Sequence, residues 1–386
     1  MIQQTAHALR SVSTGARRAE AILVPMLEES GVEVNGPAAH DMQLHDSRLW
    51  ARVLRDGSIG LGEAYMDGWW DAEALDVCLT RIVGHGLKER VQQNPVVMAY
   101  VVASRLLNMQ SKARAFEVGQ RHYDIGNDLY EAMLDSRMVY TCGYWRDAGD
   151  LDAAQEAKLD LVCRKIGAQP GMRILELGCG WGSFARFAAE RYGAEVIGLT
   201  VSREQVSLAK ERCAGLPVDI QLADYRDARG TYDAVISIGI MEHVGYKNHR
   251  TYMDVVDRCL APGGVAFVHT IGGNESKTLI DPWIHKHIFP NALLPTVSQL
   301  AAAMEGLLVL EDLHNFGPDY DRTCMAWYSN FERAWPELSA RYDERFHRMW
   351  RYYLLQCAAG FRCRYLQLYQ LVMTRPGTPQ PDCRKS

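Results

Sequence analysis

The segment ILELGCGWG, residues 174–182, joins a short apolar run to three glycines that alternate with other residues. The apolar run predicts a buried strand, and Gly178, Gly180 and Gly182 predict a turn whose backbone a ligand can approach closely. A phosphate-binding P-loop ends in Gly-Lys-Ser/Thr, whereas Gly182 is followed here by Ser183 and no lysine. The turn is therefore not expected to bind a nucleoside triphosphate.

Strand and helix patterns alternate from this segment onward. The expected strands are RILEL (173–177), EVIGLT (195–200), VDIQL (218–222), YDAVISIG (232–239) and GVAFVHT (264–270), and the expected helices span 183–191, 202–213 and 248–260. Such alternation predicts a parallel sheet with right-handed crossovers, an α/β fold of the Rossmann-like kind. Two later runs, 307–316 and 365–374, are expected to complete the sheet, and the aromatic-rich helical insertion between them is a candidate wall or lid over an apolar substrate.

Residues 1–115 are expected to form a smaller, mostly helical domain ahead of a second domain, 116–386, that contains the sheet. Within the first domain, the stretch GSIGLGEAYMDGWWD (57–71) has four glycines and two adjacent tryptophans. Glycines are common where the chain turns sharply, so we interpret this stretch as a tight, packed turn.

The chain has 386 residues, of which 48% are hydrophobic and 23% charged, as in a globular protein with a large buried core. It opens without the apolar segment typical of a signal peptide, and no run of about 18 apolar residues predicts a membrane span. The ten cysteines form no Cys-x-x-Cys pair, which indicates free thiols in a reducing, cytoplasmic compartment. A net charge of −5 argues against nucleic acid as the main partner.

One region departs from this acidic balance. Basic residues outnumber acidic ones between 81 and 121, on both sides of and within the apolar run VVMAYVVASRLL (96–107). The basic residues are Arg81, Lys88, Arg90, Arg105, Lys112, Arg114 and Arg121. A basic helix with a broad apolar face fits an anionic membrane surface. A core helix with solvated arginines at its ends explains the same pattern, and this alternative stays open.

The glycine turn by itself fits either NAD or S-adenosylmethionine, and its neighbours distinguish the two. An NAD site usually has an acidic residue at the end of the second strand, where it binds the ribose diol. Here no acidic residue follows that strand before Glu204. Thr200 and Gln205 are expected to bind the ribose instead, and Asp224 and Tyr225 to hold and stack on adenine.

Eight segments carry a more specific pattern. They are GSIGLGEAYMDGWWD (57–71), HYDIGNDLY (122–130), YTCGYW (140–145), LELGCGWGSFARFAAERYGAEVIGLTVSREQ (175–205), SIGIMEHVG (237–245), HTIG (269–272), DPWIHKHIFPNALLPT (281–296) and FGPDYDRTCMAWY (316–328). In this order they resemble the cyclopropane-fatty-acid synthases, a family of S-adenosylmethionine-dependent methyltransferases that add a methylene across the double bond of a phospholipid acyl chain. The first domain is typical of the synthases that act on membrane phospholipids, and the related mycolic-acid enzymes lack it.

The resemblance implies a class I methyltransferase sheet with S-adenosylmethionine as the cofactor. The implied partners are unsaturated phospholipid acyl chains, reached by peripheral contact with the inner face of the membrane, and a homodimer stays open. The residues expected to bind the cofactor are Tyr140, Thr141, Glu176, Gly178, Cys179, Gly180, Gly182, Thr200, Val201, Gln205, Asp224, Tyr225 and Arg226. Glu176 stands where many relatives have the shorter aspartate, so its contact with the cofactor stays open.

The resemblance also implies a bound bicarbonate ion as the catalytic base, held by Cys142, Glu242, His269 and Tyr320 with the backbone of Ile271. An alkene is a weak nucleophile, so the sulfonium methyl must be held in line with it and water must be excluded. Attack leaves a carbocation, and loss of a proton from the new methyl group closes the ring. The residue pattern agrees in part, because Glu242 follows the fourth strand and His269 ends the fifth, at the cofactor end of the sheet.

Each of these residues also has a structural interpretation. A histidine on a strand, such as His269, is more often packed than catalytic, and Tyr320 in an apolar loop fits a core equally well. Glu242 could pair with His243 at a helix start, and Cys142 could be an inert buried thiol.

Cys357 matches a further family position, but this reaction needs no covalent intermediate, so we rank it below the others as a packing residue. Aromatic ring faces stabilise cations, and the candidates for the sulfonium and the carbocation are Tyr140, Trp145 and Tyr320. Any of these rings could instead only fill space.

Two other functions stay open. A lipid methyltransferase that stops at a methyl or methylene branch would lack the anion site, whose ligands this chain retains. A non-catalytic lipid-binding or scaffolding protein would have lost the glycines or Glu242, and neither is lost. The sequence therefore favours cyclopropane formation.

Overall fold

The structure is a computed structural model that describes residues 17, 19–86 and 126–385, and the chain divides into two compact units. The first unit comprises 1–107, 281–288 and 332–365, and the second comprises 108–280, 289–331 and 366–386. The predicted domain boundary at 115/116 and the basic residues from Lys88 to Arg121 lie outside the described residues. The membrane-binding interpretation of that region therefore stays a prediction.

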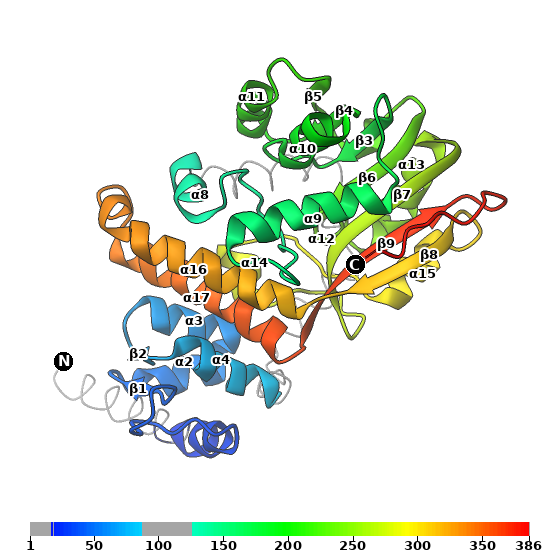
Figure 1. Cartoon of the computed structure of the whole chain (residues 1–386). Coiled ribbons are helices and arrows are strands. Elements are labelled where there is room, and N and C mark those ends of the chain that lie inside the picture. Colours follow the sequence, from blue (N-terminus) through cyan, green and yellow to red (C-terminus); the bar gives the residue numbers. More distant parts are fainter. Residues whose placement is uncertain (1–16, 18, 87–125, 386) are drawn as a thin grey trace, which may run out of the picture. The chain divides into compact units, whose positions relative to one another are not determined.

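The second unit is built on a seven-stranded sheet with the order β5-β4-β3-β6-β7-β9-β8 (Figure 1). Its strands are β3 (Arg173–Leu177), β4 (Glu195–Thr200), β5 (Val218–Leu222), β6 (Tyr232–Ile238), β7 (Leu260–Gly273), β8 (Val309–Asn315) and β9 (Leu366–Thr374). The first five are parallel, and β9 pairs antiparallel with both β7 and β8. The order reverses between β3 and β6, as in a Rossmann-like sheet, so the predicted α/β fold is confirmed.

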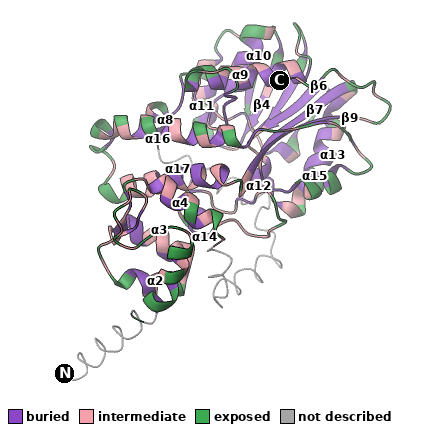
Figure 2. Ribbon diagram, turned by 60° about the horizontal axis from the view of Figure 1, so that its bottom comes forward, coloured by how far each residue is buried: buried purple, intermediate pink, exposed green. Residues whose placement is uncertain are grey.

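Helices cover both faces of this sheet. On one face, α9 (Leu151–Lys165), α10 (Ser183–Tyr192) and α11 (Arg203–Arg212) share a core with Ile174 of β3. On the other face, α13 (His249–Cys259) and α15 (Val297–Met304) share a core with Leu175. The central strands are consequently buried on both sides (Figure 2), which explains why they appear in the sequence as nearly continuous apolar runs.

The other described elements that begin in the second unit are α8 (Asn127–Met133), η1 (Tyr225–Asp227), α12 (Met241–Val244), η2 (Tyr246–Asn248) and α16 (Pro318–Leu338). The segment between the last two strands is helical, as predicted, and consists of α16 and α17 (Glu344–Arg362). Residues 332–365 of this segment belong to the first unit, so its role as a wall or lid stays a prediction.

The described part of the first unit consists of helices and a small two-stranded ribbon. Its elements are β1 (Gln43–Leu44), α2 (Arg48–Asp56), α3 (Ser58–Met66), β2 (Trp70–Asp71), α4 (Leu75–Gly84), α14 (Pro282–His287) and α17. None of the helices that the structure describes, in either unit, is long and apolar enough to cross a membrane.

The stretch 57–71 is not the tight turn predicted from its glycines, because α3 occupies most of it. Glycine weakens a helix, but Gly60 and Gly62 are required here for close packing. A Cβ on Gly60 would lie 2.4 Å from the Arg52 carbonyl oxygen, and one on Gly62 would lie 2.5 Å from the Trp283 ring. The glycines let α2 and α14 approach α3, and the turn prediction was wrong.

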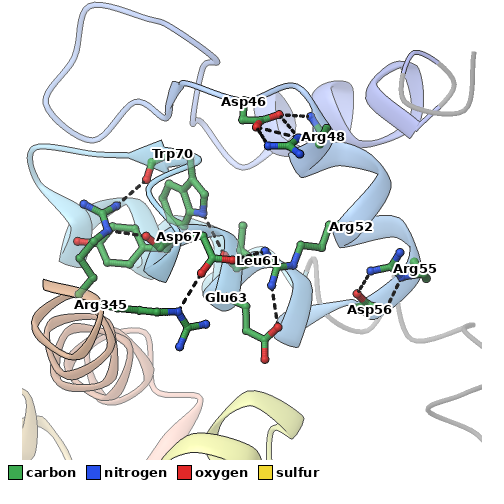
Figure 3. Close-up of polar contacts among 12 residues, drawn as sticks. Asp46, Arg48, Arg52, Arg55, Asp56, Leu61, Glu63, Asp67, Trp70 and Arg345 are labelled. Carbon is green, nitrogen blue, oxygen red and sulfur yellow. Dashed lines mark hydrogen bonds and ion pairs between the residues drawn. The ribbon is translucent and has the colours of Figure 1, made fainter. Parts of the chain in front are cut away.

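Ion pairs also join these three helices. Arg52 of α2 reaches between Glu63 of α3 and Asp67, with a nitrogen 2.7 Å from each carboxylate (Figure 3). Lys286 and His287 of α14 contact the other oxygen of Glu63. Burial acts to raise the pKa of Glu63, but the hydrogen bonds from Lys286, Arg52 and His287 lower it to about 2. Glu63 is therefore ionised at neutral pH and links the helices of the first unit.

Candidate active site

A cavity opens in the second unit at the carboxyl ends of β3, β4 and β6, where the strand order reverses. It is lined by the residue that follows each strand, namely Gly178, Val201 and Gly239. Ligands of open parallel sheets bind at this position, because the loops after neighbouring strands diverge there. The cavity is therefore the candidate cofactor site.

The three glycines of the turn have different roles. All three have positive φ angles, which glycine adopts without strain: 79° at Gly178, 53° at Gly180 and 77° at Gly182. A Cβ on Gly180 would meet no protein atom within 4 Å, and this residue lines the cavity. A Cβ on Gly182 would lie 3.1 Å from Cys213 Sγ, and Gly182 does not line the cavity. Gly180 therefore gives a ligand access to the backbone, whereas Gly182 allows packing against α11.

Gly182 is the one predicted cofactor residue that the cavity does not contact. The others all line it: Tyr140, Thr141, Glu176, Gly178, Cys179, Gly180, Thr200, Val201, Gln205, Asp224, Tyr225 and Arg226. Thr200 Oγ1 donates a hydrogen bond to Gln205 Oε1 at 2.7 Å. Arg226 Nη1 donates to Asp224 Oδ2 at 2.9 Å, and its guanidinium lies 4.8 Å from the centre of the Tyr225 ring. These contacts order the polar groups that a nucleoside would meet.

Several residues that line the cavity were not predicted from the sequence, including Lys158, Trp181 and His243. Lys158 is buried in the apolar face of α9, between Ala154 and Val162. A lysine at that spacing within an apolar helical stripe is the signal that could have identified it. The aromatic and histidine positions carry no comparable signal in the sequence.

Glu176 lies near the end of β3 and contacts the cavity. Burial raises the pKa of Glu176 to about 8, although the charge of Lys158 and a backbone hydrogen bond from Ala185 act to lower it. Its Oε2 atom accepts no hydrogen bond from the described residues. A buried carboxyl oxygen without a donor is costly, and a donor from a ligand would remove that cost.

A second polar group is built around Glu242 of α12, which follows β6. The backbone N–H of Ile271 donates to Glu242 Oε1 at 2.6 Å. Burial raises the pKa of Glu242 to about 7, although the hydrogen bond from Ile271 acts to lower it. Oε2 accepts no hydrogen bond from any residue in the described ranges. Glu242 is thus partly protonated near neutral pH and has an unpaired oxygen.

His269 lies two residues before Ile271 on β7. The strand continues to Gly273, so His269 does not end it as the sequence predicted. Gln370 Nε2 on β9 lies 3.3 Å from His269 Nδ1, and donation from this amide places the ring proton on Nε2. Burial lowers the pKa of His269 well below its usual value, so the ring is neutral. Within the described chain Nε2 has no hydrogen-bond partner.

Thr323 of α16 connects the loop that carries Cys142 to the helix that carries Tyr320. Thr323 Oγ1 accepts hydrogen bonds from Gly143 N at 3.0 Å and Trp145 Nε1 at 2.9 Å, and lies 3.9 Å from Cys142 Sγ. Tyr320 precedes Thr323 by one turn on the same helix. Burial raises the pKa of both Cys142 and Tyr320 well above their usual values, so the thiol and the hydroxyl keep their protons.

The structure brings most of the predicted catalytic residues into one unit. After burial, Cys142 and Glu242 are among the groups that act to raise the pKa of the Tyr320 hydroxyl. We call Cys142, Glu242, His269 and Tyr320, together with the backbone of Ile271, the polar cluster. Cys357 lies on α17 in the first unit, where burial raises the pKa of its thiol to about 12, and its relation to the polar cluster stays a prediction.

Six aromatic rings connect the cavity to the polar cluster, with neighbouring ring centres between 5.0 and 6.5 Å apart. This aromatic cluster consists of Tyr130, Tyr140, Trp181, Phe289, Tyr320 and Trp327. Tyr140 and Trp181 line the cavity, and Tyr320 belongs to the polar cluster. Trp145, predicted to stabilise a cation, lies outside this chain of rings and has the Arg322 guanidinium 4.6 Å from its ring centre.

Residues 110–371 match the protein family described as mycolic acid cyclopropane synthetase. The chain belongs to this family. The cyclopropane-fatty-acyl-phospholipid synthase of Escherichia coli (strain K12) is 48% identical over 350 residues, which cover 91% of this chain and 92% of the relative. The tuberculostearic acid methyltransferase UfaA1 of Mycobacterium tuberculosis is 34% identical over 369 residues, which cover 89% and 85%.

A solved structure of mycolic acid cyclopropane synthase CmaA1 complexed with SAH and CTAB superimposes with a TM-score of 0.63 and 28% identity. The match covers 67% of this chain and 97% of that one, so a third of this chain has no counterpart there. These likenesses confirm the predicted family resemblance and the class I methyltransferase fold. The chain is an enzyme of the S-adenosylmethionine-dependent methyltransferase class.

Proposed function

We propose that this enzyme transfers a methylene group from S-adenosylmethionine to the cis double bond of an unsaturated acyl chain in a membrane phospholipid, forming a cyclopropane ring. One observation carries the proposal: a cyclopropane-fatty-acyl-phospholipid synthase is 48% identical over 91% of this chain. The site adds physical support, because a cofactor cavity and a buried polar cluster are joined by aromatic rings.

The chemistry of the residues that line the cavity suits S-adenosylmethionine. Gly180 lets the cofactor approach the backbone, and the unpaired Oε2 of Glu176 suits its amino group. Thr200 and Gln205 suit the ribose, and Asp224 suits the adenine. When bound, the cofactor supplies an electrophilic methyl group on a sulfonium.

The aromatic cluster suits the next requirement, a lining that tolerates positive charge. Ring faces attract cations by about 0.5–2 kcal/mol each, and Tyr140 and Tyr320 lie at the two ends of the path from the cavity to the polar cluster. Apolar rings also exclude water, which would otherwise capture a carbocation before ring closure. We infer that the acyl double bond is bound beside these rings.

The polar cluster fits a bicarbonate ion, which would supply the base there. Glu242 Oε2 and His269 Nε2 are buried and lack hydrogen-bond partners in the described chain. The raised pKa of about 7 leaves part of the Glu242 carboxyl protonated near neutral pH, and the lowered pKa of His269 keeps its ring neutral, so the protonated form of the site presents no negative charge to an anion. Protonated Glu242, the Nε2–H of His269 and the Tyr320 hydroxyl are each able to donate a hydrogen bond to an oxyanion.

The substrate is part of a membrane, so we propose peripheral contact with the inner, cytoplasmic face. The basic residues between 81 and 121, interrupted by an apolar run, support this proposal through charge complementarity with anionic lipid. They lie largely outside the described residues, and the support therefore comes from the sequence.

A product analysis tests this function. We expect vesicles of unsaturated phospholipid, incubated with the enzyme and S-adenosylmethionine, to gain the mass of one CH₂ group per double bond. Proton NMR of the lipid should then show loss of the alkene signals and appearance of cyclopropane ring signals.

The same spectrum tests the alternative, a lipid C-methyltransferase that leaves a methyl- or methylene-branched chain. The likeness to the tuberculostearic acid methyltransferase UfaA1 favours this alternative, and the retained polar cluster favours the cyclopropane. A product that contains the added carbon as a methyl or methylene branch would contradict ring formation while leaving methyl transfer intact.

A further inference from the structure

Lys158 has no role in the function proposed above, yet its burial is extreme for a charged side chain. It lies on α9, lines the cofactor cavity and is 0% exposed. Its Nζ atom donates one hydrogen bond, to Thr141 Oγ1 at 2.9 Å. An ammonium has three N–H donors, and the described residues supply neither a second acceptor nor a carboxylate in ion-pair contact.

Burying a lysine without a paired charge is unfavourable in free energy. An ammonium removed from water without a paired charge costs several kcal/mol, and the cost appears here as a pKa lowered by burial to about 8. The Asp135 carboxyl acts against this shift and does not cancel it. A hydrophobic residue would pack in this position without the penalty, so an anionic group from a ligand is the compensation that the cavity lacks.

The chemistry and position of the groups near Lys158 indicate which anionic group of the ligand binds there. Glu176, on β3, has an unpaired buried Oε2 atom in the same cavity. Lys158 and Glu176 therefore place an ammonium and a carboxyl with an unpaired oxygen in one cavity, which is the complement of an α-amino acid zwitterion, and a ligand ammonium would favour the ionised form of Glu176. The ends of β4 and β5 hold the groups suited to a nucleoside, so the amino-acid end of the cofactor lies on the side of β3 and α9.

We propose that the Lys158 ammonium binds the carboxylate of the methionine portion of S-adenosylmethionine, opposite Glu176, which binds the amino group. Thr141 holds the ammonium in place through its single hydrogen bond. This inference rests on the proposed use of the cavity for S-adenosylmethionine. It assigns a carboxylate-binding role to a residue that the sequence motifs did not include.

Two ligands and two variants test the inference by calorimetry. S-adenosylhomocysteine has the carboxylate, and its decarboxylated analogue keeps the amine, the thioether and the adenosine. Lys158→Met should weaken the binding of S-adenosylhomocysteine by about 10- to 100-fold, the range for a hydrogen bond between charged groups. It should change the affinity for the decarboxylated analogue by less than about threefold. Lys165→Met is the matched control, because Lys165 is buried on the same helix, pairs with Asp312 at 3.0 Å and does not line the cavity. Lys165→Met should not change the affinity for one ligand more than the affinity for the other.

Equal weakening of both ligands by Lys158→Met would overturn the inference and show that Lys158 only shapes the cavity through Thr141. If Lys158→Met does not fold, the wild type alone tests the inference. Its affinity for S-adenosylhomocysteine should exceed its affinity for the analogue by a similar factor. A wild type that binds the two equally overturns the carboxylate contact and leaves the cofactor assignment intact. A wild type that binds neither overturns the cofactor assignment as well.

Discussion

Glu242 combines a buried carboxyl, a short hydrogen bond from the Ile271 N–H and an oxygen without a partner in the described chain. Because its pKa is raised to about 7, the group changes charge within the range where enzymes work. A glutamate on the surface would be ionised there and would repel an anion. Burial thus leaves part of the Glu242 carboxyl protonated near neutral pH, and in that form it is able to donate a hydrogen bond.

Glu242→Gln is expected to stabilise the ligand-free protein at alkaline pH. The folded-state pKa is raised above the unfolded value of 4.5, so the stability that the bound proton provides is complete below about pH 4.5 and is lost as the pH rises to about 7. Glutamine has no such proton, and the variant should avoid a loss of about 3 kcal/mol above pH 7. Denaturant unfolding as a function of pH measures the difference.

The control for this experiment is Glu204→Gln, which changes an exposed glutamate on α11. Its unfolding free energy should follow that of the wild type across the same pH range. A constant difference between Glu242→Gln and the wild type at every pH would contradict a raised pKa at Glu242.

Gly180→Val should abolish binding of S-adenosylhomocysteine, because the branched side chain would fill the space that Gly180 leaves open at the cavity. Gly215→Val is the matched control: Gly215 also has a positive φ, 81°, and a Cβ there would meet no protein atom within 4 Å, but it lies in an exposed turn. Both variants should lose similar backbone stability. Calorimetry that finds unchanged affinity in folded Gly180→Val would remove this glycine from the cofactor site.

At the scale of elements, Thr323 connects α16 to the loop that carries Cys142. Its hydroxyl accepts from Gly143 N and Trp145 Nε1, and donates to the Asp319 carbonyl at 2.8 Å. Tyr320 lies on the same helix, so one side chain aligns two residues of the polar cluster. We therefore expect Thr323 to act as a positioning residue for the polar cluster.

Thr323→Val should lower kcat and leave the affinity for S-adenosylhomocysteine nearly unchanged, because Thr323 supports the polar cluster and does not line the cavity. It should also cost about 1–3 kcal/mol of unfolding free energy, since two buried N–H donors lose their acceptor. Thr323→Ser keeps the hydroxyl and should restore kcat. Equal kcat losses in the valine and serine variants would show that packing by the methyl group, and not the hydroxyl, is what matters.

The elements of the sheet could be predicted closely, because their burial on both faces produces apolar runs such as RILEL and EVIGLT that match β3 and β4 to the residue. The helix α3 could not, because its glycines serve packing against other helices, through Arg52 of α2 and Trp283 of α14, which no local pattern shows. Lys158 was missed for a related reason. The apolar stripe of α9 indicates that Lys158 is buried, but only the tertiary structure shows that it lines a cavity.

At the scale of the whole molecule, the two units are not two consecutive stretches of the sequence, because each unit is made of several segments. Residues 281–288 and 332–365 belong to the first unit, although the sheet strands before and after them belong to the second. Contacts such as those of Glu63 with α14 cause this division, and no local pattern reveals them. The residues expected to bind the cofactor follow the strands in order, and all of them except Gly182 line the cavity, whereas the division into units depends on distant packing.

The membrane prediction also belongs to this scale. Charge reversal at Arg105, Lys112 and Arg114, which lie outside the described residues, should weaken binding to anionic vesicles by about 1 kcal/mol for each residue and leave cofactor affinity intact. Reversal at the exposed Arg203 and Lys210 should have a smaller effect. Co-sedimentation at low salt that is the same for the wild type and the triple variant would mean that these residues are only a solvated face.

The most direct test is to measure how turnover depends on bicarbonate in the wild type and in Glu242→Gln. This measurement tests whether the polar cluster holds an anion that acts as the base. We predict that removing bicarbonate slows the wild type steeply, since a general base contributes about 10²–10⁴-fold. Glu242→Gln should keep cofactor binding, turn over slowly and respond little to bicarbonate, because its anion is already misplaced. A wild-type rate that is indifferent to bicarbonate, with Glu242→Gln equally active, would contradict the account and leave Glu242 a structural residue.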